Sequence, residues 1–238
     1  MTIPKLILLL GAAFTLQTTN AQKTVYDANA EVRNVGAFTN IEVSSAIDLY
    51  LSMGSEDAVV VSAKEKTNTG SIVTEVKNGT LYIAYKGSGI SDWGAKNMKA
   101  YVSVKTLNKL KASGASDIFA EGIINASDLS IDISGASDFK GVVNSQNLRL
   151  KGSGSSDFVI SGKATNANIE VSGSSDIKGF GLVTENCDVH ATGSSDVNIT
   201  VNKQLKAEAS GSSDINYKGD PTVKDVKSTG ASDVNKKG

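Results

Sequence analysis

The chain of 238 residues has only one cysteine and one histidine, residue types that commonly build disulfides, metal sites and catalytic triads, and it has one tryptophan. A single cysteine excludes an intrachain disulfide, so packing must stabilise the fold. Aromatic residues make up 5% of the chain, and there are only 2 prolines. The net charge of −1 offers no basic field of the kind that nucleic acids require, so we expect no nucleic-acid partner.

Long hydrophobic runs are also missing, apart from an apolar stretch over residues 6–16 that follows Lys5. This stretch is too short for a membrane helix, so we expect no membrane span, either here or in the chain that remains after processing. Small residues at Thr19 and Ala21 are typical of a signal-peptidase site, which predicts a signal peptide over residues 1–21. The sequence therefore predicts export through the Sec pathway to the periplasm, the outer-membrane surface or the extracellular medium.

One six-residue motif occurs seven times from residue 113 onward, with the pattern [Ser/Thr]-Gly-[Ala/Ser]-Ser-Asp-[Ile/Phe/Val]. Counted along the chain, the spacings between its successive aspartates are 21, 19, 19, 20, 18 and 19. A near-constant period of this length indicates stacked copies of one small structural unit. The seven aspartates are Asp117, Asp138, Asp157, Asp176, Asp196, Asp214 and Asp233.

Apolar and polar residues alternate around each copy, as in a strand with one buried face. Four positions before the motif glycine, the seven residues are Leu, Ile, Leu, Ile, Val, Ala and Val. The unit of about 19 residues is too short for a propeller blade and lacks a helical period. The pattern predicts an all-β fold: a parallel β-helix, or β-solenoid, whose coils of about 19 residues share one continuous core.

The motif also predicts where its serine and aspartate side chains lie. If the alternation continues through the bend, the serine hydroxyls point inward and the aspartates form an outward row. Neighbouring carboxylates repel one another by roughly 1 kcal/mol in water, so something must offset the repulsion. Two explanations stay open: bonds from nearby amides and hydroxyls, or a row of Ca²⁺ ions. We expect no cofactor and keep Ca²⁺ as the alternative, because one carboxylate per coil is a small supply for an ion that takes roughly six to eight oxygens.

Residues 22–112 lack clean copies but contain a faded one at residues 44–49 (SSAIDL). Strands are expected at residues 58–63, 72–76, 81–85 and 100–104, with a tight turn at Asn78-Gly79. We interpret residues 22–112 as irregular coils that continue and cap the stack, joined directly to the seven-repeat solenoid of residues 113–238. A loop at residues 87–98 carries Trp93, which is either a ligand contact or a plug folded over the coils.

Three segments of the N-terminal region, residues 35–38 (VGAF), 41–49 (IEVSSAIDL) and 78–83 (NGTLYI), precede the Ser-Gly-Ala-Ser-Asp series. Together with that series they resemble the bacterial family called "putative auto-transporter adhesin, head GIN domain". The resemblance extends from about Val35 into the final repeats. It implies a right-handed parallel β-helix in a secreted or envelope protein of Gram-negative bacteria, and it supplies no catalytic residues.

An enzyme needs groups that converge on one place, such as two carboxylates at a chosen separation inside a cleft. Here the carboxylates form a uniform row, and the repeats lack long loops that would wall a groove. His190 falls at an outward position and Cys187 in an inward column of leucines. We therefore expect a solvated histidine and a core cysteine rather than a triad, a metal ligand or a nucleophile.

The sequence favours a non-enzymatic adhesion or interaction module of the cell envelope or surface. Its candidate contacts for a glycan or a cell-surface protein are the seven motif aspartates and Trp93. A structural envelope scaffold without a discrete ligand is the first alternative. A polysaccharide-active enzyme on a β-helix is the second, because fold does not fix function.

Overall fold

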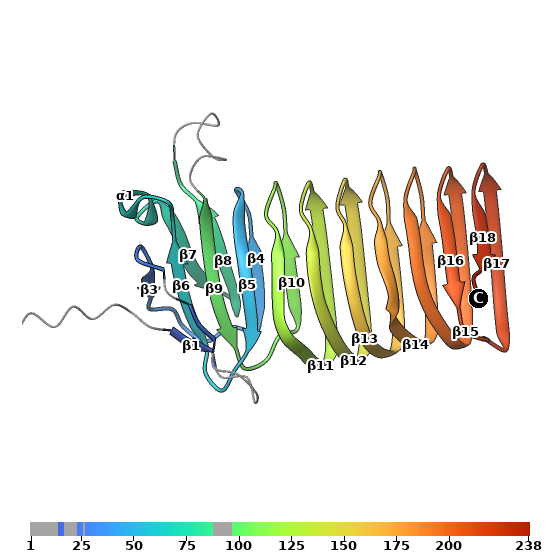
Figure 1. Cartoon of the computed structure of the whole chain (residues 1–238), viewed down its shortest axis with the longest axis horizontal. Coiled ribbons are helices and arrows are strands. Elements are labelled where there is room, and N and C mark those ends of the chain that lie inside the picture. The colour runs from blue at the N-terminus through green and yellow to red at the C-terminus, as the bar shows by residue number, and fades with distance from the viewer. Residues whose placement is uncertain (1–13, 17–22, 26, 88–96) are drawn as a thin grey trace, which may run out of the picture.

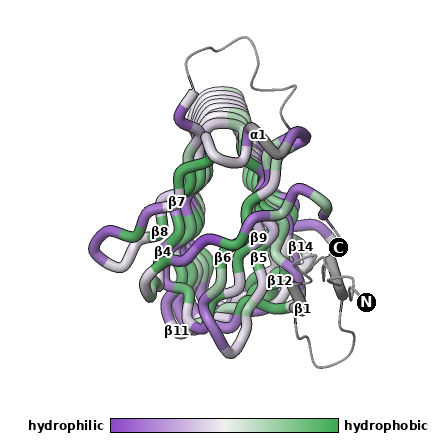
Figure 2. The backbone as a smooth tube through the Cα atoms, turned by 90° about the vertical axis from the view of Figure 1, so that its left-hand side faces the viewer, coloured by the Kyte–Doolittle hydropathy of each residue, from purple (hydrophilic) through white to green (hydrophobic). Residues whose placement is uncertain are grey.

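The computed structural model describes residues 14–16, 23–25, 27–87 and 97–238. It is a β-solenoid whose coils stack along one long axis (Figure 1). Seen end-on, successive coils superimpose on one narrow outline (Figure 2). The predicted all-β solenoid of parallel coils is therefore confirmed. Residues 1–21, apart from the strand at residues 14–16, and Trp93 lie outside the described residues, so the signal peptide and the tryptophan contact stay predictions.

The regular coils are long strands that bend around the core and return to the next motif. Each pairs in parallel with the coil before and after it. The strands are β11 (Ile118–Gly135), β12 (Phe139–Gly154), β13 (Phe158–Val171), β14 (Ile177–Ala191) and β15 (Asp196–Gly211). The stack continues through β16 (Asp214–Lys218), β17 (Val223–Gly230) and β18 (Asp233–Lys236).

The alternating apolar residues form columns inside the solenoid. Leu110, Ile131, Leu150, Ile169 and Val189 are in register from coil to coil, and all are fully buried. Because each coil covers the apolar side of the next, no coil buries its own core alone, and stability accumulates along the stack.

The N-terminal part continues the parallel stack, but not in sequence order. The strand β10 (Lys109–Ala112) pairs with β4 (Asn40–Val43), and β11 pairs with β5 (Ile47–Met53). The same β4 and β5 pair on their other side with β8 (Thr80–Tyr85) and β9 (Met98–Val104). The β4–β5 coil therefore lies between a later coil and the regular repeats.

Antiparallel strands end the parallel stacking at this side. The strand β7 (Ile72–Lys77) pairs with β8, β6 (Ala58–Ser62) pairs with β9, and β3 (Glu31–Arg33) pairs with β6. The four strands expected here are confirmed to within two residues, and Asn78 and Gly79 form the turn with φ of 50° and 72°.

Three further elements complete the N-terminal part. A four-residue helix, α1 (Lys66–Thr69), was not expected from the sequence. The strands β1 (Phe14–Leu16) and β2 (Lys23–Val25) form a separate antiparallel pair. Among the described residues, no helix has the length and apolar character needed to cross a membrane.

Candidate functional site

The serines of the fourth motif position line the inside of the bend, as the alternation predicts. They are all buried, and in four pairs of neighbouring coils the serine Oγ accepts the backbone N–H of the serine one coil earlier. Ser137 Oγ accepts from Ser116 at 3.0 Å, and Ser175 Oγ accepts from Ser156 at 3.2 Å. These hydroxyls pair buried amides that would otherwise lack partners, which makes the serine column part of the architecture.

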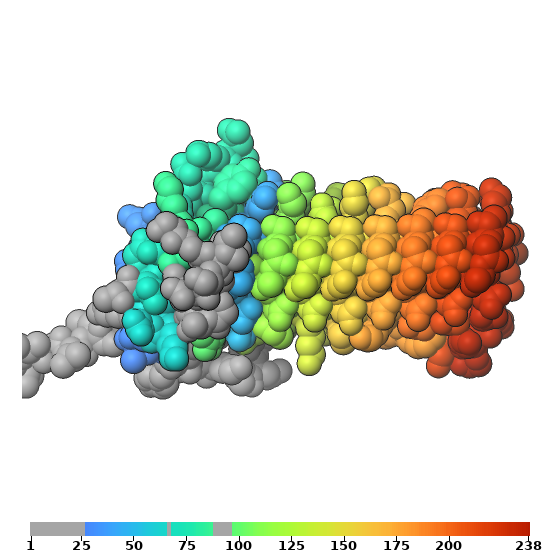
Figure 3. All heavy atoms as spheres, turned by 90° about the horizontal axis from the view of Figure 1, so that it is seen from above, coloured from blue at the N-terminus to red at the C-terminus, as the bar shows by residue number. Residues whose placement is uncertain are grey.

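The seven motif aspartates form an outward row beside the serines. Seen from above these bends, equivalent residues of successive coils form straight rows (Figure 3). Asp117 Oδ1 accepts the backbone N–H of Asp138 at 3.1 Å, and Asp138 Oδ1 accepts that of Asp157 at 3.0 Å. The same bond recurs from Asp196 to Asp176 and from Asp233 to Asp214. Amide donors thus offset part of the repulsion between carboxylates.

The row has an eighth member, Asp48, from the faded copy of the motif. Leu49 is in register with Ile118, which places Asp48 beside Asp117. Burial, and secondarily the Asp117 carboxylate, raise the pKa of Asp48 above its usual 3.8. Burial likewise raises the pKa of Asp117, with a smaller contribution from Asp138. At this end of the row, burial and mutual repulsion therefore disfavour the charged form of the carboxylates.

Several oxygens of the aspartate row are already engaged in the fold. Besides the amide bonds, Asp157 Oδ2 forms an ion pair with Lys178 Nζ at 2.6 Å. Within the part of the chain that the structure describes, no group of three or more His, Cys, Asp or Glu side chains is arranged to hold a metal.

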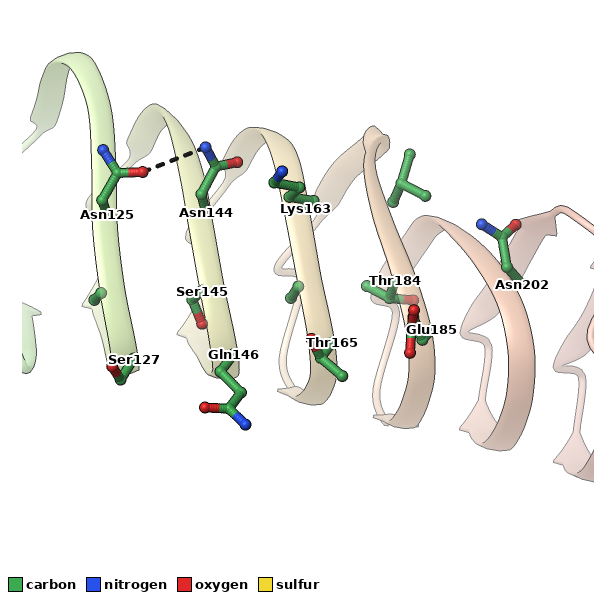
Figure 4. Close-up of a pocket in the computed structure, with 13 residues that line it drawn as sticks. Asn125, Ser127, Asn144, Ser145, Gln146, Lys163, Thr165, Thr184, Glu185 and Asn202 are labelled. Carbon is green, nitrogen blue, oxygen red and sulfur yellow. Dashed lines mark hydrogen bonds between the residues drawn. The ribbon is translucent and has the colours of Figure 1, made fainter.

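A better candidate site lies farther along each coil, where a shallow groove of about 810 Å³ crosses β11 to β15. The coils turn a corner there at residues that the coil-to-coil register skips: Ser127, Gln146, Thr165 and Glu185. Figure 4 shows this corner row opposite a second row that contains Asn125, Asn144 and Lys163. The sequence predicted no loop-walled groove, and the corner of the solenoid itself makes this hollow.

Small and buried side chains form the strip between the two rows. Ala126, Ser145, Ala164 and Thr184 are in register across four coils. Ala164 and Thr184 are buried, and Thr184 Oγ1 donates to the carbonyl of Thr200 at 2.9 Å. Because these side chains are short or turned inward, the amide and hydroxyl groups beside them stand above the strip.

A ladder of amide side chains borders the groove beyond the corner. Asn147 Nδ2 donates to Asp128 Oδ1 at 2.8 Å, Asn166 Nδ2 to Asn147 Oδ1 at 2.8 Å, and Asn186 Nδ2 to Asn166 Oδ1 at 2.9 Å. The amides in the middle of the ladder both donate and accept along the stack. The ladder holds the corner at one fixed spacing and so fixes the shape of the groove.

A second surface hollow, of about 750 Å³, adjoins three stacked aromatic rings. The Tyr50 ring lies 5.2 Å from both Tyr101 and Phe119, centroid to centroid. Burial raises the pKa of Tyr101 to about 12, with Asp27 contributing. The rings come from β9, β5 and β11, which are adjacent in the sheet but distant in sequence.

The single histidine and cysteine are not brought together with catalytic partners. His190 is partly exposed, with Nε2 3.0 Å from Asp188 Oδ1 and Nδ1 3.2 Å from Glu208 Oε2. Cys187 is buried in register with Ala167 and Leu205, and burial raises the pKa of its thiol to about 12. Both residues therefore lie where the sequence placed them, outward and inward respectively.

The groove was missed because its residues belong to the variable part of each repeat. The signal available in the sequence was the polar row Asn125, Asn144, Lys163, which recurs with the period of the motif. The aromatic stack carried no such signal, because the contact of Tyr50 with Phe119 depends on a pairing between two segments that lie far apart in the chain.

The fold and the groove together define a class: a parallel β-solenoid with a repetitive, polar lateral surface. The family model described as "putative auto-transporter adhesin, head GIN domain" matches residues 37–221, and the chain belongs to this family. Its adhesin-like character follows from that membership. No curated protein matches the chain.

Solved structures share the fold at low sequence identity. A putative adhesin from Bacteroides fragilis is 21% identical, with a TM-score of 0.82 over 87% of this chain and 96% of that one. A protein from Parabacteroides distasonis described as a putative lipid binding protein is 21% identical, with a TM-score of 0.65 over 89% and 98%. A putative adhesin from Parabacteroides merdae is 20% identical, with a TM-score of 0.63 over 88% and 95%. At these identities the likeness concerns the fold.

Proposed function

We propose that this protein is an exported, non-enzymatic β-solenoid that serves as an adhesion or interaction module of the bacterial envelope or surface. The observation that carries the proposal is the groove across β11 to β15, where similar polar groups repeat from coil to coil instead of converging on one point. A repeating surface suits an extended partner, whereas catalysis needs groups focused on one bond. The signal-peptide pattern and the family membership support export and adhesion.

A retention assay tests this function. Beads coated with the purified protein are incubated with bacterial and epithelial cells, and retained cells are counted against beads coated with an unrelated protein. Retention of cells, together with a mature N-terminus at Gln22 when the full chain is expressed in a Gram-negative host, supports the proposal. Absence of retention on every cell type, or a product that keeps residues 1–21 in the cytoplasm, contradicts it.

A structural scaffold is the second candidate, and the hydrogen-bonded aspartate row favours it. Replacing Asp157 and Asp176 with Asn separates the two functions. A scaffold predicts lower stability of this double variant and no cell retention by the parent protein. An adhesion face built on the aspartates predicts lost retention with an intact fold, and adhesion through the groove predicts unchanged retention.

A further inference from the structure

We propose that the groove across β11 to β15 binds an uncharged, hydroxyl-rich glycan chain that lies along the solenoid axis. The proposal rests on the proposed adhesion function and specifies its ligand class and its site. It moves the binding surface from the aspartate row, predicted from the motif, to the polar corner farther along each coil.

The amide groups that line the groove can form the same hydrogen bonds as sugar hydroxyls, because both donate and accept. The amides of Asn125, Asn144 and Gln146 each carry donors and an acceptor, and a hydroxyl is likewise both donor and acceptor. The bond from Asn144 Nδ2 to Asn125 Oδ1 is long, at 3.4 Å, and it uses only one of the two Asn144 N–H groups. Asn125 and Gln146 are exposed, and Asn144 is partly exposed. A ligand hydroxyl can therefore bond to these amides without breaking the fold.

The groove also offers apolar contact for the C–H face of a sugar ring. The partly exposed Ala126 methyl group belongs to the central strip, and Val183, which is 41% exposed, is in register with Lys163 of the second row. Binding sites for small polar ligands commonly combine an apolar surface with a few placed polar groups. Here the exposed apolar groups of two coils lie among polar side chains of the neighbouring coils.

The spacing of these groups favours a polymer over a single sugar. Equivalent residues of adjacent coils are separated by about 4.8 Å, the distance between neighbouring strands. The groove crosses five strands, so a chain along the axis meets further polar side chains as it passes from coil to coil, amides on β11, β12 and β15 and the Thr165 hydroxyl on β13. Repeated weak contacts then add up along the chain, as in multivalent binding.

Other polymers fit the groove less well. A peptide cannot add as a strand here, because the backbone of β11 to β15 is already paired from coil to coil. A strongly charged polymer lacks a matching field: the charged groups among the lining residues are Lys163 and Glu185, of opposite sign. The site therefore selects an uncharged chain.

Affinity electrophoresis tests the assignment directly. The purified protein is run through native gels that contain neutral glucans, mannans or xylans, and through gels that contain polygalacturonate or heparin. The test variant is Asn144→Ala combined with Gln146→Ala. The matched control is Asn216→Ala, which removes the same type of side chain and a similar bond, from Asn216 Nδ2 to Asn198 Oδ1 at 3.3 Å, outside the groove.

We expect retardation by at least one neutral polysaccharide, a roughly tenfold higher Kd for the double variant, and no change for Asn216→Ala. Retardation only by the anionic polymers, or neutral binding that the double variant leaves intact, overturns the assignment. Absence of retardation by every neutral polysaccharide also overturns it. If cells are still retained on beads in that case, the glycan groove fails while the adhesion function stands; if they are not, both fail.

Discussion

Replacing a motif glycine with alanine should show that contact between coils, and not only backbone conformation, demands glycine in the repeats. Gly154 has φ of +86°, and a Cβ there would lie 2.5 Å from the carbonyl oxygen of Gly135 in the preceding coil. Gly114 has nearly the same φ, +83°, but its Cβ would meet nothing closer than Ser45 N at 3.6 Å. An alanine at either site pays the same cost for the left-handed backbone conformation, but only the alanine at position 154 also collides with the preceding coil.

The left-handed conformation costs alanine about 1–2 kcal/mol at either site. Gly154→Ala adds overpacking of about 1–3 kcal/mol, since the new methyl group lies well inside an ordinary contact. If the two coils move apart to relieve this contact, the 2.8 Å hydrogen bond from Ser155 N–H to the Gly135 carbonyl lengthens, and that bond is worth about 1 kcal/mol. We therefore expect losses of about 1–2 kcal/mol for Gly114→Ala and about 3–6 kcal/mol for Gly154→Ala.

Urea unfolding followed by circular dichroism measures both losses, with Ser155→Ala as a control that leaves the bend glycine in place and should change stability by less than about 0.5 kcal/mol. Equal losses at Gly114 and Gly154 would refute the reasoning, because they would mean that the coils separate without cost.

Four further outcomes are expected. Ser175→Ala should cost about 1–3 kcal/mol in urea unfolding, because the buried N–H of Ser156 loses its acceptor. Asp48→Asn should raise the free energy of unfolding at pH 7, because burial and the Asp117 carboxylate raise the pKa of Asp48 and so disfavour its charged form in the native state. The native state binds this proton more tightly than the unfolded chain does, so the wild type regains the lost stability as the pH falls through the raised pKa. The native Cys187 thiol, with a pKa of about 12, should react with iodoacetamide at pH 8 about a thousandfold more slowly than the unfolded chain. A chelator should leave the midpoint of thermal unfolding unchanged, since amides already bond to the aspartate row.

Each of these four predictions has a result that would contradict it, and the first has a control variant. Ser174→Ala, at the exposed neighbour of Ser175, should be neutral, and an equal loss at both serines would remove the role of the buried bond. An Asp48→Asn gain that persists at pH 3 would contradict the electrostatic cause. Fast native alkylation of Cys187 would show that its coil opens readily. A melting point lowered by several degrees on chelation would favour calcium in the aspartate row.

The aspartate row and the groove differ in how far the sequence could anticipate them. The row was predictable because a constant motif at a constant spacing places its side chains one above another. The internal bonds of the row were not, since they depend on the height of one coil over the next. The groove was not predicted either, because it arises where a corner residue such as Gln146 falls out of the register between coils.

Local alternation and period were enough to predict the solenoid, its coil length and the inward or outward direction of most repeat residues. The order of the N-terminal coils could be known only from the folded chain. Asp48 neighbours Asp117 although the two are far apart in the sequence, because the chain forms the β8–β9 coil on the outer side of β4–β5 before it returns to start the repeats. A local pattern specifies how each strand buries its apolar face, but which strand covers that face is settled by the packing of the whole chain.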